Sequence, residues 1–156
     1  MAATARTREL ETLLARIRNA GNVQLNYEMW SDRGRQFAAA DECARMDGEL
    51  AAATRDQADA RAALTALVAS SSADDVAAWA GAHDAYLAAF LAGSARDGTA
   101  FDVATKERAA WADVRAGKLP FVDENLFYVT LDADRYRALF GIDPNTLEPV
   151  TAAEPA

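Results

Sequence analysis

The most regular pattern of apolar positions lies between Asp32 and Ser70. Small or apolar residues recur there in alternating steps of four and three, with one polar member: Ala39, Cys43, Met46, Leu50, Ala53, Gln57, Ala60, Leu64 and Leu67. This heptad spacing predicts a long helix with one continuous buried seam. Charged residues fill the outer positions, as they do on a helix face that is turned to water.

A second helix is expected directly after Ser70-Ser71-Ser72, with Ser72 or Asp74 as its N-cap. Its apolar stripe holds Val76, Trp79, Ala80, His83, Leu87 and Phe90. Because a short connection favours antiparallel neighbours, residues 35–93 are expected to form a helical hairpin. In that hairpin the small seam residues face the aromatic stripe, and the imidazole of His83 points between the two helices.

Three shorter helices complete the helical pattern. Leu10, Leu13, Leu14 and Ile17 fall on one face of a helix that is expected to end near Gly21. A helix from about residue 100 to residue 116 is expected to stop at Gly117. A last short helix is expected to begin after Asp132 and to end before Gly141.

Residues 23–30 allow two interpretations. Val23, Leu25, Tyr27 and Met29 alternate with mostly polar residues, as in a half-buried strand. Val23, Tyr27 and Trp30 also satisfy a helical spacing. We favour the strand, because residues 126–131 are rich in β-formers and the two segments could pair their backbone groups.

The predicted fold class is therefore mostly α with a minor β part: an antiparallel helical bundle built on a long helical hairpin, with a small two-stranded β ribbon. Residues 1–142 are expected to form a single helical domain, since 156 residues suit one core. Residues 143–156 contain prolines, acids and small residues, and are expected to form a flexible acidic C-terminal tail.

Composition adds constraints on partners. The chain holds 39 alanines, which favour close helix packing but bury little area each. The formal net charge is -8, and only residues 1–35 carry a basic surplus. Binding to duplex DNA requires a clustered basic face, so no direct duplex nucleic-acid binding is expected. An alanine-rich composition is typical of GC-rich genomes, which suggests a bacterial or phage source.

Cys43 is the only cysteine, so no intrachain disulfide can form. The N-terminal residues lack the apolar stretch of a secretory signal, and charges interrupt every window long enough to span a bilayer. We therefore expect a cytoplasmic protein that does not enter a membrane.

Signatures of catalysis or cofactor binding are weak. His83 is the only histidine and no Glu-x-x-His pair occurs, so neither a metal nor a cofactor is expected. The paired acids lie at the ends of predicted elements, where helix capping explains them. No nucleophile elbow or phosphate-binding glycine loop occurs. Enzymatic activity is uncertain and a non-enzymatic role is favoured.

Three functional hypotheses remain. The first is a protein–protein interaction or assembly module, for which a protein partner or self-association is expected. Its candidate interface residues are the aromatics near the predicted ribbon: Tyr27, Trp30, Phe127 and Tyr128. The second is a small-ligand-binding protein or enzyme with a helical-bundle pocket formed by His83, Trp79 and Tyr86. The third is an acidic inhibitor that imitates nucleic acid toward a basic partner.

Overall fold

A computed structural model describes residues 5–30, 34–118, 133–144, 146 and 148–150, with the side chains of α1 described as far as Tyr27. These residues form five helices: α1 (Ala5–Trp30), α2 (Ala40–Ala69), α3 (Ala73–Gly93), α4 (Thr99–Arg115) and α5 (Ala133–Phe140). The mostly helical fold class is therefore confirmed. No sheet occurs in the described residues, which hold one isolated β-bridge between Ile142 and Pro149.

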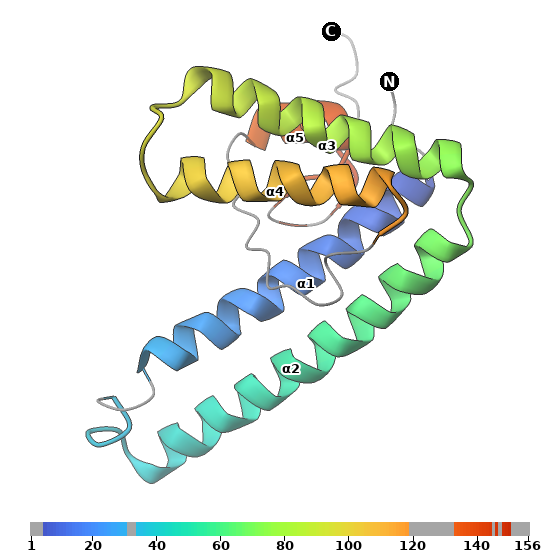
Figure 1. Ribbon diagram of the computed structural model, residues 1–156. Coiled ribbons are helices and arrows are strands. Elements are labelled where there is room, and N and C mark those ends of the chain that lie inside the picture. The colour runs from blue at the N-terminus through green and yellow to red at the C-terminus, as the bar shows by residue number, and fades with distance from the viewer. Residues whose placement is uncertain (1–4, 31–33, 119–132, 145, 147, 151–156) are drawn as a thin grey trace, which may run out of the picture.

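The helices pack in two long pairs, α1 with α2 and α3 with α4, while the short α5 lies against α3 and α1. Figure 1 shows that α1 and α2 extend together as a two-helix arm, whose far end lies away from α3, α4 and α5. The other end of this arm joins α3, α4 and α5. We call that part the base, and it contains most of the buried residues.

The prediction that residues 35–93 form a helical hairpin, with α2 packed along α3, is wrong. α2 and α3 diverge from their connection at residues 70–72, and the small seam of α2 faces α1 instead (Figure 1). The Gln57 amide in that seam donates a hydrogen bond to the backbone oxygen of Ile17, over 3.4 Å. A short connection makes two helices neighbours at one end only, and the leucine stripe of α1 supplies the better complement.

Residues 23–30 form the last turns of α1, so the strand prediction is wrong and the helical alternative is right. The helical spacing brings Tyr27 toward α2, where its hydroxyl donates to Glu49. Gln24 likewise reaches Thr54 over 3.3 Å. Packing against a long neighbouring helix therefore outweighs the local β-propensity of this segment. Its proposed partner strand, residues 126–131, lies outside the described residues.

Several helix ends agree with the sequence. The Ser72 hydroxyl caps α3 by accepting a hydrogen bond from the backbone N–H of Asp75. Gly117 follows α4 with a φ of 82°, and Gly141 follows α5 with a φ of 67°. Both values lie in the left-handed region that favours glycine at a helix C-terminus.

The chain after α5 turns back on itself. The backbone N–H of Asp143 donates to the oxygen of Glu148, and that of Val150 donates to the oxygen of Gly141. The first part of the expected tail is therefore folded into a tight loop against the end of α5. The division into a single helical domain over residues 1–142 and a flexible acidic tail over residues 143–156 stays a prediction.

Candidate functional site

The base contains a buried polar cluster centred on Glu11 of α1, whose side chain is almost completely enclosed. The indole Nε1 of Trp79 donates to Glu11 Oε1 over 2.7 Å, and Nε2 of His83 contacts the same oxygen. The hydroxyl of Tyr136 donates to the other oxygen, Oε2. One carboxylate therefore connects α1 to α3 and α5.

Aromatic rings enclose the imidazole of His83. It stacks on Trp111 of α4 with ring centroids 3.9 Å apart and 7° between the planes. Phe140 of α5 lies against it at 4.4 Å. Trp79 meets Trp111 edge to face at 4.8 Å. His83 therefore faces α1, α4 and α5, and the prediction that it lies between α2 and α3 is wrong.

The electrostatics of Glu11 follow from this geometry. Burial alone raises the pKa of a carboxyl group, because it penalises the charged form. The charge of His83 and the hydrogen bonds from His83, Tyr136 and Trp79 outweigh burial and hold the pKa of Glu11 below its usual value. Burial and the neighbouring carboxylate raise the pKa of Tyr136, which stays protonated as a donor.

Glu107 of α4 is a second buried carboxyl group in the base. Burial raises its pKa to about 8, although the indole of Trp111 and the charge of Arg18 act in the opposite direction. The Trp111 indole donates to Glu107 Oε1 over 3.4 Å. At neutral pH the base therefore holds one charged carboxylate, Glu11, and one protonated acid, Glu107.

The three residues predicted to bind a ligand all lie in the base, with exposed fractions of 3% for Trp79, 3% for His83 and 4% for Tyr86. The Tyr86 ring packs edge to face on Tyr136 and Phe140. A Glu–His pair can exchange a proton, but a substrate would need access to side chains that are almost completely buried. Their contacts explain all three residues as core, and a ligand-binding role stays a prediction.

Sequence reasoning singled out His83 but missed the two buried acids of the base, Glu11 and Glu107. A signal was present for Glu107, which falls on the buried stripe of α4 with Ala104, Trp111 and Val114. A charged residue at a stripe position indicates either a break in the pattern or a paired buried charge. Glu11 lies immediately beside the leucine stripe of α1, where the pattern does not distinguish it from a solvated residue.

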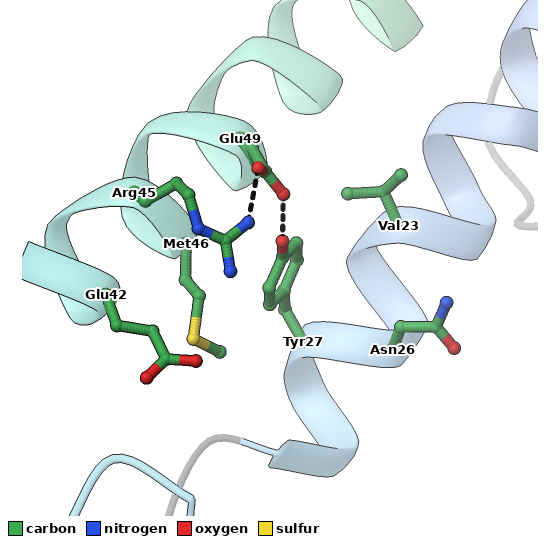
Figure 2. A pocket seen from close by; sticks show the side chains of 7 residues that line it. All are labelled: Val23, Asn26, Tyr27, Glu42, Arg45, Met46 and Glu49. Carbon is green, nitrogen blue, oxygen red and sulfur yellow. Dashed lines mark hydrogen bonds and ion pairs between the residues drawn. The ribbon is translucent and has the colours of Figure 1, made fainter. Parts of the chain in front are cut away.

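A second candidate site lies near the far end of the arm. A groove of about 540 Å³ opens between α1 and α2 (Figure 2). We call it the distal groove, and its lining residues are Val23, Asn26, Tyr27, Glu42, Arg45, Met46 and Glu49. Figure 2 shows the Tyr27 side chain standing between the two helices, with Met46 of α2 on one side of its ring and Val23 of α1 on the other.

Hydrogen bonds fix one wall of the distal groove. Glu49 accepts from the Tyr27 hydroxyl through one oxygen and from Arg45 Nη1 through the other, the second over 2.6 Å. The Tyr27 ring is therefore held upright between the helices. Tyr27 was one of four aromatics predicted to form an interface.

The other three predicted interface residues cannot be placed in this site. The Trp30 side chain, Phe127 and Tyr128 lie outside the described part of the chain. Among the described residues, the aromatic side chain with the highest exposure at the arm's end was not one of the four predicted interface residues. Phe37, in the turn before α2, is 88% exposed.

Comparisons with family models, with curated proteins and with solved structures found no match for this chain. No group of three or more potential metal ligands occurs among the residues described above. No helix in those ranges has the length and apolar character needed to cross a bilayer. Function must therefore be argued from the two sites themselves.

Proposed function

We propose that this protein is a protein–protein interaction module in which the two-helix arm is the docking element and the base is its rigid support. One observation carries the proposal: the arm ends in a largely exposed phenylalanine, Phe37, near an open groove that contains Tyr27. Large aromatic side chains of this kind supply most of the binding energy in protein interfaces.

The base has the properties that a support needs. Glu11 connects α1 to α3 and α5 by hydrogen bonds, and Trp111 brings α4 into the same cluster. α1 also forms half of the arm. The buried contacts that Glu11 makes in the first turns of α1 therefore fix the orientation of the arm relative to the base. A rigid scaffold reduces the conformational entropy that is lost when a partner binds.

The acidic surface favours a protein over a nucleic acid as partner. The chain carries 24 acidic and 16 basic residues. Acidic residues also outnumber basic ones on the outer face of α2. Phosphate backbones would be repelled by such a surface. Binding to a protein remains compatible with it, including binding to a basic one.

Site-specific photo-cross-linking tests the proposal. A benzophenone amino acid at Phe37, in cells that naturally make the protein, is expected to give one adduct of defined mass, because a docked partner covers this position. The matched control places the same group at Leu139 of α5, which is 37% exposed and lies in the base. Adducts that are absent, or identical at the two positions, would contradict a docking role for the arm.

A further inference from the structure

We infer that the distal groove receives an amphipathic helix with a cationic polar face, supplied by a different protein. This inference rests on the proposed interaction function and specifies the partner for it. It follows from three observations: the way burial changes along the arm, the shape of the groove, and the charge that surrounds it.

Burial along the arm indicates that a third helix is missing at its far end. On α2, seam residues Ala60 and Leu64 near the base are completely buried, whereas Met46 and Leu50 are only half-buried. On α1, Ile17 is buried and Leu25 is 39% exposed. Near the base the leucines of α1 belong to the core cluster that α3, α4 and α5 complete. Farther out, no other helix of the described ranges lies over the α1–α2 pair (Figure 1).

A pair of helices with a half-covered seam is completed by one more helix. Apolar side chains of the incoming helix enter the groove at i, i+3, i+4 and i+7, as in other helix-in-groove complexes. The distal groove offers apolar surface from Val23, Met46 and the Tyr27 ring, in a volume of about 540 Å³. Such a volume is enough for several side chains but is open, so it suits a helix face better than an enclosed small molecule.

Charge determines the polar side of that helix. Both arginines between residues 34 and 49 already form ion pairs, Arg35 with Asp47 and Arg45 with Glu49. Asp41 and Glu42 are exposed, and Glu42 lies at the edge of the groove in Figure 2, where it interacts with Arg45 through charge but not through a direct ion pair within the described residues. Lysine or arginine residues that flank the apolar stripe of the partner would pair with these two carboxylates.

The same charges disfavour a second copy of this chain as the occupant. Two arms docked through their distal grooves would bring Asp41 and Glu42 of one copy toward acidic residues of the other. Like charges placed opposite each other weaken an interface, and each copy has a formal net charge of -8. The occupant is therefore expected to be basic where this chain is acidic.

Two matched helical peptides test the inference on the full chain. Each has about 18 residues, roughly 27 Å of helix, with leucine at the apolar heptad positions. One carries lysine and the other glutamate at the polar positions. Fluorescence anisotropy at low salt is expected to show at least about tenfold tighter binding of the lysine peptide, and this preference is expected to shrink as salt screens the charges.

Variants locate the binding. Glu42→Lys is expected to weaken binding of the lysine peptide by about tenfold. Asp97→Lys makes the same change of charge on the turn between α3 and α4, and is expected to alter binding by less than about twofold. Met46→Ser removes apolar surface without changing charge and is expected to weaken binding of both peptides. Circular dichroism checks that each variant keeps its helical content.

Several results would overturn the inference. Binding of neither peptide, equal binding of both, or equal losses from Glu42→Lys and Asp97→Lys would each contradict it. If the adduct formed at Phe37 proves to be a second copy of this chain, or joins a partner through an acidic or non-helical segment, the basic-helix partner is wrong while the interaction function stands. If Phe37 gives no adduct, the interaction function itself fails.

Discussion

Glu11→Gln is expected to destabilise the protein by about 3 kcal/mol at pH 7, a large share of the roughly 5–15 kcal/mol that stabilises a typical domain. The carboxylate accepts hydrogen bonds from Trp79 and Tyr136 and contacts Nε2 of His83. An amide of the same size has one accepting oxygen, and its NH2 group would meet one of these donors. The substitution therefore leaves a buried donor unpaired and removes the charge that faces the imidazole. Urea denaturation measures the change.

The pH dependence of this effect has a definite sign. Because the pKa of Glu11 is lower in the folded protein than its usual value of 4.5, its contribution to stability is present above pH 4.5 and is lost as pH falls through the folded pKa. The difference between wild type and Glu11→Gln is therefore expected to be largest near neutral pH and to shrink in acid. Glu9→Gln, at an exposed position of the same helix, is expected to have little effect at any pH.

A double-mutant cycle separates pairing from simple packing. His83→Phe keeps a flat ring against Trp111 but removes the nitrogen that faces Glu11. If the two side chains stabilise the base through their mutual contact, Glu11→Gln costs less in the His83→Phe background, with a coupling energy of about 1–3 kcal/mol. Additive losses would mean that the polar contact contributes nothing beyond the volume of each side chain.

The sequence predicted helices better than it predicted their partners. The heptad seam from Ala39 to Leu67 is a local pattern, and it correctly indicated a long helix with one packed face. An apolar stripe indicates that one face of a helix packs against a neighbour, but it does not indicate which helix that neighbour is. The short turn at residues 70–72 suggested α3, whereas the complementary stripe lay earlier in the chain, on α1.

In the base, too, local sequence patterns predicted which residue is buried but not which residue it contacts. His83 stood out because it was polar on an apolar stripe, and its burial agrees with that signal. The acid that pairs with it is 72 positions away in sequence, so no local spacing connects Glu11 to His83. The distal groove was partly foreseen through Tyr27, but for a ribbon that residues 23–30 do not form.

Glu107→Gln is expected to stabilise the protein at neutral and alkaline pH, the opposite of Glu11→Gln. The pKa of Glu107 is raised from 4.5 to about 8 by burial, so between these values the folded protein holds a proton that the unfolded chain releases. Stability therefore falls by about 1.4 kcal/mol per pH unit across this window and levels off above pH 8. At pH 7 the raised pKa of Glu107 therefore lowers the free energy of unfolding by at most about 3 kcal/mol.

An amide at position 107 removes that cost, because glutamine is neutral at every pH and its oxygen can still accept from Trp111. The gain over wild type is expected to be small near pH 4.5, to grow with pH, and to reach its maximum above pH 8. Asp113→Asn, on the exposed face of the same helix, removes an acid without burial and provides the control. A gain that did not change between pH 5 and pH 9 would mean that Glu107 is charged in the folded protein, and that Arg18 compensates its burial far more strongly than their arrangement indicates.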